Sequence, residues 1–427
     1  MATVVVIGGG WSGCAAAIGA RKAGCDVILL EKTDLLLGLG NVGGIMRNNG
    51  RYTATEECIA LGGSELFEIT DKYTKHKGID FPGHDHASIY NVTKIEKPVR
   101  DLVRNMGIDV RFFSRVVDVE VDNPILRAIE LESGEKIYGD AFIDTTGSSG
   151  PMGNCTKYGN GCAMCILRCP SFGGRVSVTA RCGIEDMIGR RNNGDYGAFS
   201  GSMKILKESL SEEIQKELNE KGCAVVPLPQ ELRNSEKLDI KVCQQYALPA
   251  FSENIVLIDT GHAKLMSPFF NLEKLRMVPG FEGALIVDPY SGGKGNSIRY
   301  MAVSPRDNYM RAKGMKNLFV AGEKSGFYVG HTEAICTGSL AGHNAARYCN
   351  GMYLLQLPTN LLIGDFIAYS NQEMHKDDGD KKRFTFAGSL YFNRMKELGF
   401  YTVDVDEIRK KVKEVGLEDI YNKKIIK

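Results

Sequence analysis

The feature that most constrains the fold of this chain is a glycine turn that directly follows an N-terminal apolar run. Val4–Ile7 is rich in β-branched residues and leads into a Gly-x-Gly-x-x-Gly turn at residues 8–13, after which an alanine-rich segment begins. That segment ends in a basic turn and Gly24, as helices often do, and a second apolar run, Val27–Leu30, follows. This order of parts predicts an α/β fold that begins with a nucleotide-binding βαβ unit.

Each residue of the turn has a physical role in a Rossmann-type site. Gly8 permits the tight turn, Gly10 lets the backbone approach a pyrophosphate, and Gly13 lets the helix pack closely on the strand. The helix N-terminus then faces the diphosphate. Glu31 ends the second strand, where a carboxylate accepts ribose hydroxyl groups. A Rossmann-like domain that binds no nucleotide is the structural alternative.

Two later segments favour FAD over NAD. Three short apolar runs between residues 111 and 138 predict a β-meander, which leads into Ala141–Gly147 with its Thr146-Gly147 turn, and Asn317–Glu323 is an apolar strand that stops at a glycine and an acid. This order resembles the flavoproteins with two dinucleotide folds, in which the Thr-Gly turn touches FAD and the final Gly-acid pair meets the ribitol phosphate. No second Gly-x-Gly-x-x-Gly follows a strand. Electrons are therefore expected from a nicotinamide docked beside the flavin or from a ferredoxin-like redox protein.

The distance between these pieces implies a discontinuous domain. The predicted fold is α/β, a glutathione-reductase-like FAD-binding domain interrupted by an inserted α+β domain. The expected segments are 1–150 for the first FAD-binding part, 151–275 for the insertion, 276–370 for the second FAD-binding part and 371–427 for a C-terminal helical tail.

Several glycine-rich stretches narrow the family. The loop Gly38–Gly44 and the segments Val278–Ala284, Arg299–Tyr309, Gly330–Ala346 and Leu357–Gly364 carry the likeness. The chain resembles the GidA-type tRNA-modification flavoproteins and, in its C-terminal third, the folate- and FAD-dependent tRNA uracil-54 methyltransferases.

The resemblance implies specific roles along the chain. The helix that starts near Thr332 should point its N-terminus at the flavin N1–C2=O edge and stabilise the reduced anion. His331 and Glu333 are the expected catalytic residues, and His331 should contact flavin or substrate. The expected cofactor-binding residues are Gly8, Gly10, Gly13, Glu31, Lys32, Asn41, Gly43, Gly44, Val117, Thr146, Gly147, Gly322, Glu323 and Thr332.

The chain also departs from the methyltransferases. They carry a nucleophilic cysteine in the loop after the second strand, where this sequence has Gly40-Asn-Val-Gly-Gly44. The favoured function is therefore an FAD-dependent oxidoreductase of this lineage with an unknown substrate. A methylenetetrahydrofolate- and FAD-dependent tRNA uracil methyltransferase is the alternative, and a non-catalytic flavin redox sensor is a third hypothesis.

Five of the twelve cysteines crowd between Cys155 and Cys182. In a reduced compartment such crowding favours a metal or redox site over a disulfide framework. The favoured interpretation is a [4Fe–4S] cluster that exchanges electrons with the flavin, with a zinc site as the second choice and redox-active disulfides or simple packing as the third. The predicted ligands are Cys155, Cys162, Cys165 and Cys169, with Cys182 in reserve.

Charge and hydropathy limit the expected partners. Lysine and arginine (53) nearly balance aspartate and glutamate (52), so no overall positive field draws the chain to nucleic acid or membrane. No apolar run reaches the length of a membrane span, and a cytoplasmic location is expected. His84-Asp-His86 is expected to be a solvated turn. Arg306 is expected to be a solvated loop charge, with contact to an anionic substrate as the alternative. Asp404–Lys427 predicts an amphipathic helix that packs or makes a dimer contact, with RNA contact second.

Overall fold

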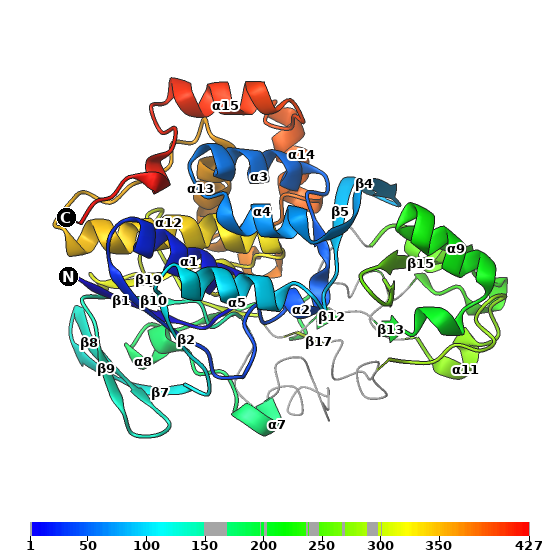
Figure 1. Cartoon of the computed structure of the whole chain (residues 1–427), viewed down its shortest axis with the longest axis horizontal. Helices are drawn as coiled ribbons and strands as arrows, with labels where there is room; N and C mark the ends of the chain where they lie inside the picture. The colour runs from blue at the N-terminus through cyan, green and yellow to red at the C-terminus, as the bar shows by residue number, and fades with distance from the viewer. Residues whose placement is uncertain are drawn as a thin grey trace.

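A five-stranded parallel sheet forms the centre of the computed structural model (Figure 1). The description below covers residues 2–148, 169–196, 198–199, 203–235, 238, 247–266, 270–287, 298–299 and 301–426. The strand order is β19-β10-β1-β2-β6, and every neighbouring pair is parallel. The strands are β1 (Thr3–Ile7), β2 (Asp26–Leu30), β6 (Asp109–Arg111), β10 (Ala141–Asp144) and β19 (Leu318–Val320).

The predicted βαβ unit is present. Helix α1 (Trp11–Lys22) links β1 to β2, and Gly24, with φ of 104°, takes the left-handed conformation that glycine tolerates best. Strand β19 comes from the C-terminal half of the chain and pairs with β10, so the sheet is completed by segments far apart in sequence. This confirms the α/β fold and the discontinuity of the nucleotide-binding sheet.

Helix α12 (His331–Cys349) packs directly on α1 over one face of the sheet. Glycines make this approach possible. A Cβ atom on Gly338 would overlap the carbonyl oxygen of Ser12, and one on Gly342 would overlap that of Ala16. The two helices therefore meet backbone to backbone, and α1 is buried along nearly its whole length between the sheet and α12.

The opposite face of the sheet is covered by the predicted β-meander. Strands β7 (Val116–Asp122), β8 (Ile125–Leu131) and β9 (Lys136–Tyr138) are antiparallel. Val5 and Ile7 of β1 join the meander's apolar residues and helix α8 (Val178–Arg181) in one cluster, whereas Val4 and Val6 point to the α1 side. The alternation of side chains along a strand thus divides the core between the two faces.

Further helices form a layer beyond α1 and α12 (Figure 1). Helix α3 contacts α12, α13 and α15, so the C-terminal helices pack onto the N-terminal half. The expected helix over 404–427 is shorter than predicted, because α15 ends at Glu414 and Gly416 follows with φ of 72°. The helices are α2 (Gly40–Gly43), α3 (Gly50–Ala60), α4 (Glu65–Lys72), α5 (Glu96–Asn105), α13 (Leu362–Met374), α14 (Ser389–Glu397) and α15 (Val405–Glu414).

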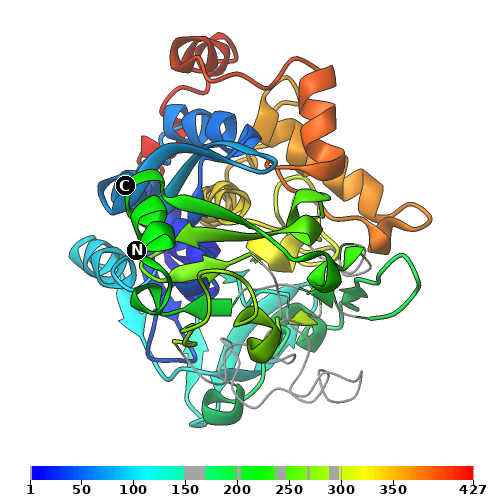
Figure 2. The ribbon, with the colours of Figure 1, turned by 90° about the vertical axis from the view of Figure 1, so that its right-hand side faces the viewer.

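The insertion has its own antiparallel sheet, which faces the viewer in Figure 2. Its strand order is β13-β16-β15-β14, and its apolar cluster runs from Met203 to Ala284. This cluster includes residues on both sides of the boundary expected at residue 275. The elements are β13 (Met203–Ile205), α9 (Glu212–Lys221), β14 (Cys223–Pro227), α10 (Ala250–Glu253), β15 (Asn254–Asp259), β16 (Ala263–Leu265) and α11 (Leu272–Leu275).

A three-stranded sheet links the insertion to the nucleotide-binding part. Its order is β3-β5-β4, and its residues Ile89 and Phe81 share an apolar cluster with Ile258 of β15. Among the described residues, no helix has the length and apolar character needed to cross a bilayer. The remaining elements are β3 (Ile45–Met46), β4 (Thr74–Phe81), β5 (His84–Tyr90), α7 (Cys169–Phe172), β11 (Met187–Ile188), β12 (Ala198–Phe199), β17 (Ile298–Arg299) and β18 (Ala302–Val303).

Candidate functional site

The glycine turn closes tightly at the end of β1. Gly8 has φ of 103°, and its N–H donates to the carbonyl of Leu30 at 2.8 Å. A Cβ atom on Gly13 would overlap the carbonyl oxygen of Gly8, so only glycine lets α1 start this close to the strand. A Cβ atom on Gly10, in contrast, would meet nothing within 4 Å. The backbone at Gly10 therefore faces the space that a pyrophosphate needs.

The start of α1 is a second feature that suits a bound anion. Gly10 caps the helix without a side-chain hydrogen bond, so the first-turn N–H groups remain available for an anion. Within the described part of the chain, the buried Ser12 hydroxyl has no hydrogen-bond partner. Gly322 lies against Ser12, and a Cβ atom there would come within 2.7 Å of the Ser12 Cβ atom. The residues present therefore fit the diphosphate of a dinucleotide.

Glu31 is held beside the turn. Its Oε2 accepts the Gly9 N–H at 2.8 Å, and its Oε1 accepts the Thr33 N–H at 2.9 Å. This fixes the carboxylate at the carboxyl end of β2, where a ribose would lie. The neighbouring Lys32 points elsewhere, since its Nζ donates to the carbonyl of Gly173 at 2.8 Å. Lys32 therefore links the fold to the segment after α7.

The later cofactor segments converge on the same edge of the sheet. Thr146 donates its N–H and hydroxyl to Asp144, and Gly147 follows with φ of 80° and with open space at its Cβ position. The Ser148 hydroxyl donates to Glu323 at 2.9 Å. These contacts bring the Thr-Gly turn and the Gly-acid pair together, as the order of parts predicted.

The meander adds an irregularity at the predicted position. The β7–β8 ladder shifts its register between Val116 and Asp118, so Val117 lies at a bulge. Bulges free backbone groups from the ladder and often occur beside ligand sites. Val117 therefore remains a candidate for backbone contact with the nucleotide.

Sequence reasoning missed a buried lysine behind this edge. Lys324 is fully buried, and its Nζ donates to Ser177 Oγ at 2.7 Å and to Asp186 Oδ1 at 2.6 Å. Burial lowers the pKa of this lysine, and the carboxylates of Asp144 and Asp186 act against that change. The position of Lys324 directly after the Gly-acid pair could have drawn attention to it. Its partners could not be predicted, because they lie about 140 residues away in the sequence. The lysine ties the start of the insertion to the site.

The N-terminus of α12 meets the glycine-rich loop. His331 begins this helix, and a Cβ atom on Gly43 would overlap its ring, so the loop passes directly over the imidazole. The ring centroid of His331 lies 6.2 Å from that of Trp11 and 6.3 Å from that of Tyr90. Tyr90 in turn donates its hydroxyl to the carbonyl of Gly40 at 2.6 Å. The predicted neighbours His331 and Gly43 are thus brought together.

The other loop residues have structural contacts. Asn41 donates its side-chain amide to the carbonyl of Leu36 at 2.8 Å, and Gly44 takes a left-handed conformation with φ of 82°. Thr332 is buried at the start of α12, with its hydroxyl near the sulfur of Met46. These contacts explain how the loop is shaped but do not test cofactor binding.

Glu333 occupies a saturated site. Its Oε1 accepts the Thr385 hydroxyl at 2.7 Å and the Phe386 N–H at 2.8 Å, and Arg51 donates to both carboxylate oxygens at 3.1 Å. The side chain is fully buried. These contacts favour a positioning role for Glu333, which holds the C-terminal segment against the start of α12, over the catalytic role expected.

The insertion contributes a lysine that sequence reasoning did not single out. Lys264 of β16 is buried, and its Nζ donates to the carbonyl of Val42 at 3.0 Å and to that of Gly43. Thr260, in the turn before β16, packs its methyl group against Gly44. An ammonium group from the insertion therefore lies beside the loop that covers His331.

Two other expectations are corrected. His84 is not in a solvated turn: it is 1% exposed, stacks on Phe81 at a centroid distance of 4.4 Å and pairs with Asn48 at 2.8 Å. Burial lowers its pKa to about 3. Arg306 is not a solvated loop charge, because its guanidinium is buried and donates to the carbonyls of Ser325 and Ile367.

The cysteine cluster lies mostly outside the described residues. Cys155, Cys162 and Cys165 fall there, while Cys169 begins α7. Cys182 is buried, and burial together with Asp144 raises its pKa to about 12. Across the parts of the chain that can be described, no group of three histidine, cysteine or acidic side chains is placed to hold a metal ion.

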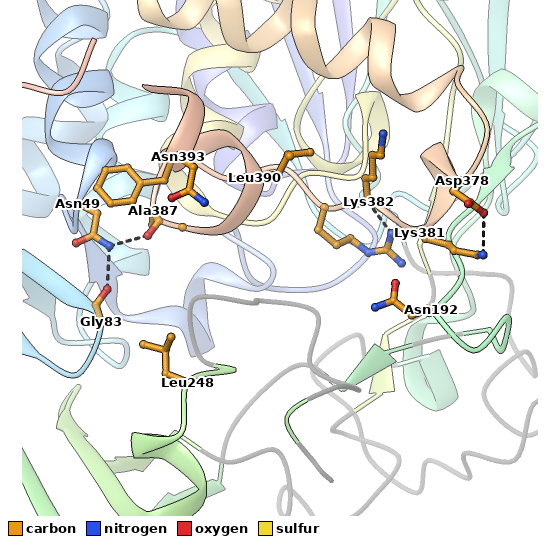
Figure 3. Close-up of a pocket in the computed structure, with 13 residues that line it drawn as sticks. Asn49, Gly83, Asn192, Leu248, Asp378, Lys381, Lys382, Ala387, Leu390 and Asn393 are labelled. Carbon is orange, nitrogen blue, oxygen red and sulfur yellow. Dashed lines mark hydrogen bonds and ion pairs between the residues drawn. The ribbon is translucent and has the colours of Figure 1, made fainter. Parts of the chain in front are cut away.

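A cavity of about 910 Å³ opens between the insertion and the C-terminal segment (Figure 3). Asn49 forms part of its wall and donates to the carbonyls of Gly83 and Ala387. Ala387 lies two residues beyond Thr385, which contacts Glu333, so the wall continues to the start of α12. The lining residues are Asn49, Gly83, Asn192, Leu248, Asp378, Lys381, Lys382, Arg383, Ala387, Gly388, Leu390, Phe392 and Asn393.

The family profile described as glucose inhibited division protein A matches residues 3–254 and 263–353. The chain belongs to this FAD-dependent family. The crystal structure of Aquifex aeolicus GidA superposes with a TM-score of 0.65 at 15% identity, over 97% of this chain and 76% of that one, which confirms the fold. The turn, the Thr-Gly edge and α12 are thus set in the fold of this family.

Two curated relatives match at higher identity over short stretches. The methylenetetrahydrofolate tRNA-(uracil-5-)-methyltransferase TrmFO of Thermosipho melanesiensis is 33% identical over 97 residues, which cover 22% of this chain and 21% of that protein. The tRNA uridine 5-carboxymethylaminomethyl modification enzyme MnmG of Thermus thermophilus is 28% identical over 123 residues, or 27% of this chain and 20% of that protein. The aligned stretches thus span about a fifth of the length of these relatives.

The buried His84 predicts a stability loss in acid. Its pKa is about 3 in the folded chain against 6.5 for a free histidine, so the unfolded chain binds the extra proton first. Stability should be greatest above pH 6.5 and fall toward pH 3, with His84 contributing up to about 1.4 kcal/mol per pH unit.

Urea unfolding of His84→Gln at several pH values measures this slope. The variant should lose less stability than the unaltered chain between pH 6.5 and 4, whereas the matched variant at the exposed His375, His375→Gln, should retain the original slope. Equal slopes for all three proteins would contradict a neutral, buried His84.

Proposed function

We propose that this chain is an FAD-dependent enzyme that modifies uridine in tRNA, with methylenetetrahydrofolate as the one-carbon donor. The observation that carries the proposal is the meeting of three elements at one place: the N-terminus of α12, the Gly43 loop against His331, and Lys264 from the insertion. Both curated relatives reported above act on tRNA uridine by name. Bound FAD would supply hydride transfer and a carrier for a one-carbon unit.

The chain's own residues would set the polarity of this site. The first-turn N–H groups of α12 and the Lys264 ammonium both favour negative charge beside the Gly43 loop. His331 lies at the same place and is the residue best situated to hold or release a proton. Arg51 and Glu333 neutralise each other and fix the start of α12, so they orient the site without taking part in proton transfer.

The mechanism would differ from that of methyltransferases with a loop cysteine. The segment Gly40–Gly44 contains no thiol. Cys14 and Cys336 are buried, and burial raises the pKa of each well above that of a free thiol. Cys223 is half-buried with a raised pKa and lies against the carbonyl of Asp80. We therefore propose that Cys14, Cys336 and Cys223 take no part in a covalent thiol step.

Turnover on tRNA tests the proposal. A tRNA whose uridines carry tritium at C5 should release tritium when methylenetetrahydrofolate and a reductant are supplied. Lys264→Met should retain its flavin but lower the rate of release by about tenfold, the scale expected for one charged contact at a reacting site. Lys274→Met, an exposed lysine of the same insertion, is the control and should behave as the unaltered chain. No release from any tRNA would contradict this function.

A second function keeps the favoured interpretation of the sequence, an oxidoreductase in which an iron–sulfur cluster feeds the flavin. One structural observation favours it. Ser148 precedes the cysteine-rich segment and contacts Glu323. Phe172 follows the segment, and its ring centroid lies 6.0 Å from that of Phe113 in the nucleotide-binding part. Both flanks of the segment are therefore anchored beside the nucleotide site.

Metal analysis of anaerobically purified protein tests this second function. We expect about four iron and four sulfide per chain if the cluster is present. Replacing Cys165 and Cys169 with serine should remove the iron, while Cys182→Ser should not, because Cys182 is buried within the apolar cluster on the meander side of the sheet. Iron-free protein that carries zinc, or no metal, would contradict the cluster and leave tRNA modification as the proposed function.

A further inference from the structure

The cavity in Figure 3 lies partly outside the region that the family profile matches. The profile ends at residue 353, and one wall of the cavity is built from residues 378–393. Its volume of about 910 Å³ is within the range of small-molecule sites. The family profile therefore does not indicate what this wall binds. The residues that line the wall are the guide to its ligand.

The charged residues in the lining are mostly cationic. Lys381, Lys382 and Arg383 stand against a single acid, Asp378. The ion pair between Lys381 and Asp378 has an N–O distance of 2.7 Å, and the Asp378 side chain is 68% exposed, so solvent weakens the pair and Lys381 can turn to a ligand at little cost. This excess of positive charge suits an anion.

Lys382 is also available to a ligand. Its Nζ pairs with Glu373 at 2.7 Å, but Lys376 pairs with the same carboxylate from its other oxygen at 2.5 Å. If Lys382 turned toward an anion, Glu373 would keep a cationic partner. The two lysines thus share one acid, and of the two only Lys382 lines the cavity.

The remaining wall combines a helix start with apolar surface. Ala387 and Gly388 line the cavity directly before α14, so its first-turn N–H groups face an incoming anion and add to the lysine charge. Leu248, Leu390 and Phe392 offer apolar contacts for a ring. A ligand with a phosphate group and a planar heterocycle satisfies both parts of this lining.

The cavity adjoins the site described above. The Asn49 side-chain amide donates to the carbonyl of Ala387, and the Phe386 N–H donates to Glu333 at the start of α12. We propose that this cavity binds a nucleotide unit of the substrate, with Lys381 and Lys382 on its phosphate. The inference rests on the proposed function in placing the substrate here. The phosphate could belong to a free nucleotide or to an RNA strand.

Calorimetric titration of the FAD-loaded chain tests the proposal. The probes are uridine, uridine 5′-monophosphate and a short uridine-containing RNA at one ionic strength. We expect the monophosphate or the RNA to bind at least about tenfold more tightly than uridine. Lys382→Met should weaken that binding about tenfold, as expected for one charge-assisted contact, and Lys376→Met should change it less than about twofold.

The matched pair separates ligand binding from folding. Both lysines pair with Glu373, so both variants lose the same kind of ion pair and should unfold alike. Binding of the monophosphate that depends on Lys382 supports a free nucleotide, and binding of RNA alone that depends on Lys382 supports a strand phosphate. Equal effects of the two variants, or equal affinity for uridine and both phosphate probes, would overturn the proposal.

Measuring the flavin content of each preparation distinguishes a failure of the cavity assignment from a failure of the proposed function. Protein with no FAD that binds the phosphate probe through Lys382 would refute the proposed function and leave the cavity assignment standing. Protein that carries FAD and acts on tRNA, yet binds the probes without dependence on Lys382, would refute the cavity assignment alone.

Discussion

The close approach of backbone to backbone at the end of β1 is the constraint on which the rest of the structure depends. Gly13 places the start of α1 against the carbonyl of Gly8, and Gly338 and Gly342 let α12 lie directly on α1. Side chains at these positions would push the helices away from the sheet. Because both helix N-termini are held at the carboxyl edge of the same sheet, one can face a diphosphate and the other a flavin ring.

The insertion completes the site that this framework begins. Lys264 and Thr260 reach the loop over His331, and Lys324 fastens the Asp186 segment behind the Thr-Gly edge. The C-terminal segment also contributes to the site, because Thr385 and Phe386 donate hydrogen bonds to Glu333. The site is therefore composite, and a chain of hydrogen bonds joins the cavity wall at Ala387 to Glu333 at the start of α12.

Local patterns were sufficient to predict the nucleotide-binding unit, because its chemistry is set by neighbours in sequence. Glycine spacing predicted the turn and short apolar runs predicted the meander, whereas the start of the helix at His331 was expected from the family resemblance. The predictions for His84 and Glu333 were incomplete because contacts with residues distant in sequence help to set their environments, Asn48 for His84 and Arg51 with Thr385 for Glu333. Lys264 is 221 residues from Gly43, whose carbonyl it contacts, so no local sequence pattern could predict this contact.

Flavin binding by a Gly10→Val variant tests the central claim most directly. Gly10 has φ of −66° and ψ of −179°, which valine adopts readily, and its Cβ position is open, so the fold should persist while the valine fills the space meant for the pyrophosphate. We predict that the unaltered chain binds one FAD, and that the variant unfolds at a similar temperature but binds FAD at least about a hundredfold more weakly. Equal FAD affinity in both proteins would contradict the account.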